Sequence, residues 1–387
     1  MSFRFASMLR TVRRSLFQTT GPETRLTAKR IAVMCLVFPA YLGLQIIHRL
    51  GFLLDEIFFR GYRRQPVWEP VFVIGVPRSG TTLLQRLLAR DREQFTSMKL
   101  WEVLFAPSVT QKRFWLWVGR LDRLLGEPLH RAVVAFEKRR FAGLNKLHKL
   151  SLFEAEEDDP ILLHIFASGF LGFFFPDDDE IRSLVRFDLE IPADERRRVM
   201  NWYRGCVQRH LYVFGPGKRF LSKNPAFSMK VCSLDEEFPD AKIVCTVRDP
   251  FQVVPSTISL FSMFQSPFCS AVDPAAVRER ALNLTGDFYR HPIATFADRP
   301  PSSHLIIRYD TLVKDPEGAI TGLYQRFGFA ISPEYQVTLQ QEGVKARAYR
   351  SEHTYSLEGF GLTPADIVER YGDIIKRFGF SPEVTPR

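Results

Sequence analysis

The sequence predicts an α/β protein with a P-loop-like core, in which a central parallel sheet is flanked by helices. A helical insert and N-terminal membrane-associated helices are expected in addition. Three observations predict this class. An apolar stretch ends at Gly75 in a glycine-containing loop that opens an amphipathic helix, short apolar segments alternate with helical ones after residue 218, and residues 31–47 are almost wholly apolar.

The first 65 residues are expected to form a basic arm followed by apolar helices. Seven basic residues and one acidic residue lie in the first thirty positions, which accounts for +6 of the net charge of +10. The apolar run from Ile31 to Ile47 is at the short end for a bilayer span, and Pro39 near its centre favours a kink. The run also starts too late for a cleavable signal peptide.

Basic residues flank this apolar segment on both sides, so they give no clear orientation. Such symmetry suits a shallow hairpin or an interfacial helix whose two ends share one side of the membrane. We therefore expect residues 31–59 to associate with a membrane. A pair of buried packing helices is the alternative.

The rest of the chain, residues 66–387, is expected to form one domain. Residues 100–217 show helical periodicity with aromatic faces, and we interpret them as a helical insert that shapes a binding pocket. The strands are predicted in the apolar stretch ending at Gly75 and at Gln94–Met98, Phe220–Leu221, Lys242–Val247 and Leu305–Tyr309. Ligands of such a sheet bind beyond the carboxyl ends of its strands.

The loop from Gly75 to Gly80 has the spacing of a P-loop, in which backbone N–H groups and a helix dipole meet at one anion site. Thr81 stands where nucleotide triphosphatases have a lysine, and Arg78 lies inside the loop. This loop is therefore not suited to magnesium-ATP. A guanidinium fork with hydroxyl donors suits a phosphosulfate diester.

Three blocks of sequence together resemble a known family. They are Gly75–Thr82; Lys223-Asn224-Pro225 with Phe238–Pro250 and Ser256; and Leu305–Asp310 with Asp315-Pro316. They resemble sulfotransferases that use 3′-phosphoadenosine 5′-phosphosulfate (PAPS), of the bacterial type, with similarity to tyrosylprotein sulfotransferases in the donor-binding motifs.

The resemblance implies a role for each matching residue. Arg78 and the N–H groups of Ser79, Gly80, Thr81 and Thr82 would hold the 5′ side of PAPS, Arg248 and Ser256 would hold its 3′-phosphate, and Tyr309 matches the family's tyrosine on a later strand. Lys223 would sit on the transferring group. We expect Lys223 to supply a cation for the oxygens of that group, as an oxyanion donor does.

The catalytic base is less well defined by the sequence. Glu102 falls near the position of the family's glutamate, a few residues further from Arg78, and is the first candidate. The acidic run Glu154, Glu156, Glu157, Asp158 and Asp159 is a second source, and a solvated helix start is its alternative. His164 is the best of the eight histidines as a base, with a packed core residue as its alternative. A basic loop with Lys345, Arg347, Arg350 and His353 is a candidate cover for the 3′-phosphate of the nucleotide, with a solvated turn as its alternative.

Composition narrows the remaining classes. The 35 phenylalanines suggest an aromatic acceptor pocket or simple core filling. Five cysteines without CxxC spacing indicate reduced thiols, no metal site is expected, and no nucleic-acid-binding pattern appears.

We therefore expect a membrane-associated, PAPS-dependent sulfotransferase that faces the cytoplasm and sulfates a hydroxyl or amine of a small, hydrophobic or lipid-like acceptor. The alternatives are a P-loop small-molecule kinase and a non-catalytic, membrane-associated nucleotide-binding protein.

Overall fold

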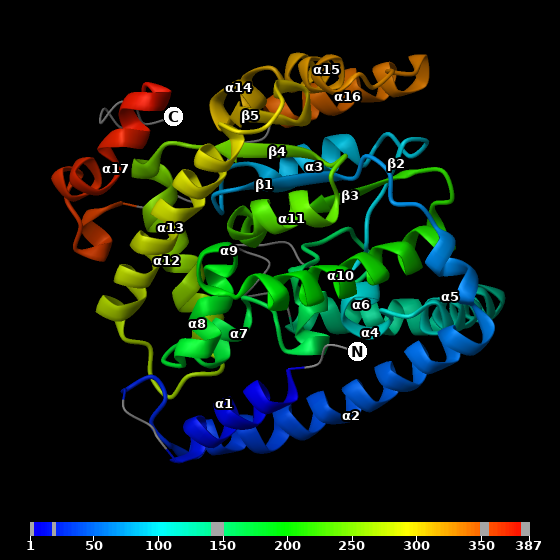
Figure 1. Ribbon diagram of the computed structural model, residues 1–387, viewed down its shortest axis with the longest axis horizontal. Helices are drawn as coiled ribbons and strands as arrows, with labels where there is room; N and C mark the ends of the chain where they lie inside the picture. The colour runs from blue at the N-terminus through cyan, green and yellow to red at the C-terminus, as the bar shows by residue number, and fades with distance from the viewer. Residues whose placement is uncertain (1–3, 18–20, 141–150, 349–355, 381–387) are drawn as a thin grey trace.

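The computed structural model describes residues 4–17, 21–140, 151–348 and 356–380. Its centre is a five-stranded sheet with the strand order β2-β3-β1-β4-β5, and every pair of neighbouring strands is parallel (Figure 1). The strands are β1 (Val71–Gly75), β2 (Phe95–Thr96), β3 (Arg219–Lys223), β4 (Lys242–Val247) and β5 (His304–Arg308). The predicted fold class is confirmed. β2 is shorter than expected, and Tyr309 begins a helix instead of ending β5.

Both faces of the sheet are covered, as the continuous apolar character of β1 requires. Phe72 and Ile74 point to one face and join the larger core, whereas Val71 and Val73 point to the other face. The helices on the larger side are α10 (Ala193–Phe214), α11 (Val231–Glu237), α12 (Pro250–Gln265) and α13 (Pro274–Phe296). Those on the smaller side are α3 (Thr81–Leu88), α15 (Pro316–Phe327) and α16 (Pro333–Ala348).

The predicted helical insert is present, and the described residues between 100 and 217 contain no strand. Its helices are α4 (Leu100–Phe105), α5 (Val109–Leu124), α6 (Pro128–Arg140), η3 (Asp159–Ile165), α7 (Leu171–Phe174), α8 (Asp179–Val185), α9 (Phe187–Glu190) and α10. The remaining elements are η1 (Arg60–Arg64), η4 (Pro225–Lys230), η5 (Pro301–Ser303), α14 (Tyr309–Lys314), η6 (Glu358–Phe360) and α17 (Pro364–Phe378).

The N-terminal region forms α1 (Phe5–Phe17) and one long helix, α2 (Ala28–Phe58), which lies along the edge of the molecule farthest from the sheet (Figure 1). Of the two expected shapes, the structure has the single helix and not the hairpin, because Pro39 is accommodated inside α2. The alternative of a buried helix pair does not hold, since only 11% of the most apolar stretch of α2 is buried. The domain boundary at residue 65 stays a prediction.

Candidate active site

The loop after β1 is fixed by two glycines with left-handed backbone angles. Gly75 has φ +134°, and a Cβ there would lie 2.2 Å from the carbonyl oxygen of Thr246 on β4. Gly80 has φ +92°, and its Cβ would lie 2.8 Å from the ring of Tyr309. Larger residues at either position would push the loop away from its neighbours. The loop is thus packed tightly between β4 and the start of α14.

The helix that follows the loop presents free N–H groups to an anion. Gly80 is the N-cap of α3, and the first intrahelical bond runs from Leu84 N to Gly80 O at 3.0 Å. The N–H groups of Gly80, Thr81, Thr82 and Leu83 therefore have no acceptor within the helix, and the helix dipole adds positive potential there. This geometry fits the predicted anion cradle.

Ser79 is placed differently from the other residues of the predicted cradle. Its hydroxyl lies 2.6 Å from Thr246 Oγ1 and 2.5 Å from the carbonyl oxygen of Val76, and its N–H donates to that same carbonyl at 3.2 Å. The side chain is fully buried. Ser79 therefore holds the loop onto β4 instead of offering its hydroxyl to a ligand.

Five of the predicted donor-binding residues lie in contact with one another at this loop. Arg78 Nε donates to Ser256 Oγ at 3.2 Å, and Arg248 Nη1 donates to the carbonyl oxygen of Arg78 at 3.0 Å. The Arg248 guanidinium lies 4.1 Å from the ring centroid of Tyr309, whose ring also contacts Gly80. Residues more than 200 positions apart in the sequence thus form one basic site.

Arg248 is held so that part of its donor fork remains available. Its Nε and Nη2 donate to Gln252 Oε1 at 3.0 and 2.9 Å, in addition to the bond to Arg78. Among the contacts of the described residues, three of its five N–H groups are therefore used and two remain. Burial lowers the pKa of Arg248 below its usual value, although the nearby Tyr309 partly offsets burial.

Lys223 lies at the carboxyl end of β3, next to β1, and its side chain is almost completely buried. Its Nζ lies 3.1 Å from Glu156 Oε1 and 3.1 Å from Glu157 Oε1. Burial alone would lower the pKa of Lys223, but the two carboxylates outweigh burial and raise the pKa above its usual value. The two carboxylates thus favour the charged form of Lys223 at this edge of the sheet.

The two glutamates reach Lys223 because the segment that carries them runs beside the start of α4. Lys99 and Ala155 form an antiparallel bridge, and Leu100 N donates to Glu154 O at 3.1 Å. Glu154 itself is exposed. The insert thus delivers two carboxylates, Glu156 and Glu157, to a lysine of the sheet.

The last two residues of the acidic run have structural partners. Asp158 accepts hydrogen bonds from Tyr203, Ser222 and Asn224, and burial raises the pKa of Asp158 to about 6 despite these bonds. Asp159 pairs with Lys230 at 2.9 Å. Asp158 thus fastens the insert to β3, and Asp159 fastens it to η4.

Glu102 lies inside the protein rather than beside Lys223. One carboxylate oxygen lies 2.8 Å from His210 Nδ1 and 3.5 Å from Lys112 Nζ, and the other accepts from Lys99 N at 3.1 Å. Burial would raise the pKa of Glu102, but His210 and Lys112 outweigh it and lower the pKa. The role of Glu102 as a base stays a prediction, and its surroundings favour a structural role.

The other basic candidates take no described part in this site. His164 is buried between Val103 O and Gln45, and burial lowers its pKa to about 3, so the ring stays neutral. Lys345 and Arg347 lie in the last part of helix α16 and not in the predicted loop, whereas Arg350, His353 and the side chains of Lys345 and Arg347 are outside the described part of the chain.

One grouping that the sequence did not predict lies between α9, α11 and α13. Asp188, Cys232 and His291 come close enough to hold a metal ion. However, Asp188 already accepts from the N–H groups of Cys232 and Ser233 and lies 3.0 Å from His291 Nε2. We interpret the grouping as an ion pair that joins three helices.

Comparison with known proteins agrees with this geometry. A model of the sulfotransferase family matches residues 70–333, which include every element of the site described above. The chain belongs to the sulfotransferase family. It is accordingly an enzyme that transfers sulfuryl groups.

Individual relatives come from mycobacteria. An omega-hydroxy-beta-dihydromenaquinone-9 sulfotransferase, Stf3, of Mycobacterium bovis and of Mycobacterium tuberculosis is 29% identical over 324 residues, which is 80% of this chain and 75% of the relative. The crystal structure of the sulfotransferase STF1 from M. tuberculosis H37Rv aligns with a TM-score of 0.71 at 21% identity, over 95% of this chain and 92% of that one. The sulfotransferase STF9 from Mycobacterium avium aligns with a TM-score of 0.73 at 17% identity, over 98% of both chains. These two structures share the fold of this sulfotransferase.

Proposed function

We propose that this sulfotransferase moves a sulfuryl group from PAPS to a hydroxyl, or an amine, of a small hydrophobic or lipid-like acceptor. The observation that carries the proposal is the meeting of Arg78, Arg248, Ser256 and Tyr309 at a P-loop whose lysine is replaced by Thr81. Two guanidinium groups at one loop suit a donor with phosphate at both its 5′ and 3′ ends.

The donor would be held at two places. The N–H groups of Gly80, Thr81 and Thr82 with Arg78 would bind the 5′-phosphosulfate at the start of α3. The two remaining N–H groups of Arg248, with the Ser256 hydroxyl, would bind the 3′-phosphate. Tyr309 backs the Arg248 guanidinium from the other side.

The transfer itself needs a cation and a base. We assign the cation to Lys223 and the base to Glu157, since Glu157 lies beside Lys223 and is the more exposed of the two glutamates, at 21% against 10% for Glu156. Glu157 would take the proton of the acceptor hydroxyl while the acceptor oxygen bonds to sulfur. The bond from sulfur to the 5′-phosphate oxygen would break, and adenosine 3′,5′-bisphosphate would leave with Lys223 beside the released oxygen.

A cluster of phenylalanines supports a hydrophobic acceptor. Phe170 and Phe173 at α7 pack against Phe261 and Phe264 of α12 with ring centroids 5.1–6.4 Å apart, mostly edge to face, and all four rings are only half-buried. α12 is the helix that carries Ser256, so the cluster follows the donor site along one helix. The Stf3 relative is named for a menaquinone-derived lipid acceptor. An isoprenoid or similar lipid alcohol fits both observations.

The proposal includes membrane association through residues 31–59. α2 is long and apolar enough to cross a membrane by length and composition. PAPS is made in the cytosol, so the catalytic domain would face the cytoplasm.

Ligand-dependent stability tests the choice of donor. Thermal unfolding is followed with adenosine 3′,5′-bisphosphate and, separately, with magnesium-ATP. A ligand at 100 times its dissociation constant adds about 2.7 kcal/mol to the free energy of unfolding. We expect stabilisation by the bisphosphate alone. Stabilisation by magnesium-ATP alone would contradict a PAPS donor and favour the alternative of a P-loop small-molecule kinase.

Turnover tests the chemistry. The enzyme is incubated with PAPS and hydroxylated isoprenoid lipids in vesicles, and sulfated products are measured by mass spectrometry. We expect Glu157→Gln to lower kcat by ~10²–10⁴-fold and to leave the affinity for the bisphosphate unchanged. Glu156→Gln is the matched control on the same lysine. Equal turnover in Glu157→Gln and in the unaltered enzyme would exclude Glu157 as the base.

A further inference from the structure

The outer surface of α2 is unusual for a protein in water. Its most exposed residues after Lys29 are all apolar as far as Phe58, and the charged residues Arg49 and Glu56 in this range are only partly exposed. The largest are Ile31, Leu36, Val37, Leu42, Ile46, Ile47, Leu50, Leu53, Leu54, Ile57 and Phe58. At 1.5 Å per residue this surface is about 40 Å long. Contiguous apolar surfaces of this size mark a binding site.

The inner surface of α2 is tied to the protein by buried polar side chains. Near its start, Arg30 donates to the carbonyl oxygens of Phe174 and Phe268 at 2.8 and 2.9 Å. Near its end, Asp55 lies 2.9 Å from Arg209 Nε and also accepts from the N–H of Val109 at 2.9 Å. α2 is therefore fastened to the catalytic domain at both ends.

The middle of α2 is fastened in the same way. Gln45 Nε2 lies 3.3 Å from His164 Nδ1, and His48 Nδ1 lies 2.8 Å from Gln111 Nε2. Gln45, His48 and Asp55 fall on one face of the helix at spacings of three and seven residues. A helix that crossed a bilayer would have to break these bonds and place the same polar side chains in hydrocarbon, where they are strongly disfavoured.

α5, which packs against α2, carries a second set of exposed apolar residues. The two helices approach closely at Gly51, where a Cβ would lie 2.5 Å from Ser108 Oγ. Four apolar residues of α5 follow helical spacing and are at least 39% exposed: Phe114, Trp117, Leu121 and Leu124. Exposed tryptophan is typical of the membrane–water interface.

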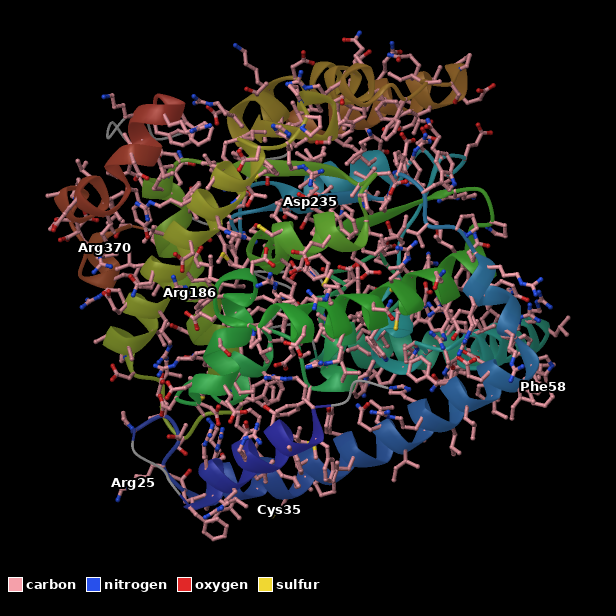
Figure 2. All side chains as sticks on the ribbon, viewed as in Figure 1. Arg25, Cys35, Phe58, Arg186, Asp235 and Arg370 are labelled. Carbon is pink, nitrogen blue, oxygen red and sulfur yellow. The ribbon has the colours of Figure 1, made fainter. Side chains whose placement is uncertain are left out.

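The charges at the two ends of α2 favour an anionic bilayer over a second copy of the chain as the partner of this surface. Basic residues stand at both ends of α2: Arg25 before it, Lys29 in its first turn, and Arg60, Arg63 and Arg64 after it. Figure 2 shows Arg25, Cys35 and Phe58 along this outer edge of the molecule. If α2 of a second copy packed against it, in either direction, a basic end would face a basic end. An anionic bilayer surface complements both ends at once.

We propose that α2 and α5 together form an in-plane platform that seats the enzyme on an anionic lipid surface without crossing it. The inference rests on the proposed function only in that a lipid acceptor would be taken from the same bilayer. Arg30, at the start of the platform, binds the backbone of Phe174 and Phe268, next to the four half-buried phenylalanines at α7 and α12. The acceptor cluster therefore borders the platform.

Vesicle binding without any substrate tests the platform separately from the chemistry. The full chain is mixed with vesicles of phosphatidylcholine containing 30% phosphatidylglycerol, and the bound fraction is measured by flotation. We expect Ile46→Asp/Leu50→Asp to weaken binding by at least tenfold. The matched control is Val337→Asp/Val368→Asp, which alters residues of similar exposure on α16 and α17 and should bind as the unaltered chain does.

The depth of fluorescent probes in the bilayer then distinguishes an α2 that lies in the membrane plane from an α2 that spans the membrane. Cys35 is the exposed cysteine among the five, and a polarity-sensitive fluorophore is attached to it in a Cys232→Ser background. A second variant carries the probe at Ile57→Cys instead, with Cys35→Ser. We expect quenching by spin-labelled lipids to place both probes at the same shallow depth, accessible from the outside of the vesicle.

Other outcomes would overturn the platform. Probes on opposite sides of the vesicle membrane would show a spanning helix. A solution dimer that Ile46→Asp/Leu50→Asp dissociates, together with absent vesicle binding, would assign the surface to a second copy. Sulfuryl transfer to a soluble alcohol should be unaffected by the same substitutions, so failure of the platform and failure of the proposed function remain separable.

Discussion

Replacing Arg248 by alanine is the most direct test of the donor site. We expect Arg248→Ala to weaken binding of adenosine 3′,5′-bisphosphate by about 150-fold. Adenosine 5′-monophosphate, which has no 3′-phosphate, should bind almost equally to both proteins.

The magnitude follows from the geometry of the guanidinium. Three of its N–H groups are already bonded to Arg78 O and Gln252 Oε1 among the described residues, which leaves two for a phosphate. A hydrogen bond to a charged group contributes about 1.5 kcal/mol at the low end. Two such bonds amount to about 3 kcal/mol, which corresponds to about 150-fold in the dissociation constant.

Isothermal titration calorimetry measures this change independently of any loss of stability. Arg248 is largely buried and also bonds to the loop, so its removal will lower the free energy of unfolding of the unliganded protein as well. Arg248→Lys is the matched variant: it keeps the charge but lacks the planar fork, and we expect an intermediate loss. Arg370→Ala, which removes an exposed ion pair with Glu279, should leave affinity unchanged.

One result would refute this reasoning. If folded Arg248→Ala bound the bisphosphate as tightly as the unaltered enzyme, the 3′-phosphate would have to be held elsewhere. The same conclusion would follow if the variant lost equal affinity for the bisphosphate and the monophosphate, since Arg248 would then act on the shared part of the nucleotide.

Three further predictions follow from the described contacts. Gly80→Ala should lower stability by about 1–3 kcal/mol in urea unfolding, because its Cβ meets the Tyr309 ring at positive φ, whereas Gly322→Ala, with no neighbour within 4 Å, should not. Glu102→Gln should lower stability by about 3 kcal/mol, since it leaves a buried lysine unpaired; lost turnover at full stability would instead support a catalytic base. Burial lowers the pKa of His291, but hydrogen bonds to Asp188 and Cys232 outweigh burial and raise the pKa to about 9. Protonated His291 should therefore add to the free energy of unfolding fully below pH 6.5, and this contribution should be lost as the pH rises through 9. The same pH dependence should be missing when urea unfolding of His291→Gln is measured.

The resemblance to the sulfotransferase family placed Arg78 and Arg248 in one site, and the structure brings these two residues together. The strand ending at Gly75 and the strand ending at Val247 are short apolar runs, and parallel strands place their carboxyl ends at one edge. Residues that follow these strands, such as Arg78 and Arg248, therefore lie at the same edge, and they meet because β1 and β4 are neighbours in the sheet.

The carboxylates beside Lys223 could not be predicted in the same way, because their position depends on a contact between two segments that no sequence pattern indicates. Whether Glu102 or Glu157 reaches Lys223 is decided by the antiparallel contact of residues 151–157 with residues 98–101, and this contact has no alternating apolar pattern. For α2, however, the sequence does contain a pattern that indicates packing against the protein. Gln45, His48 and Asp55 lie on one helical face, and this polar stripe distinguishes a docked helix from a spanning one.

These differences have a common origin in how the molecule is built. The sheet supplies the donor cradle and Lys223, whereas the carboxylates beside Lys223 arrive on the insert, and the insert also supports α2 through His164, Gln111 and Arg209. A displacement of α2 would thus shift the insert and its two glutamates before it shifted the sheet. Seating on a membrane would accordingly affect the position of the acceptor base more than the binding of the nucleotide. The expected signature is a change in kcat on adding vesicles, at constant affinity for adenosine 3′,5′-bisphosphate. A change confined to nucleotide affinity would contradict this coupling.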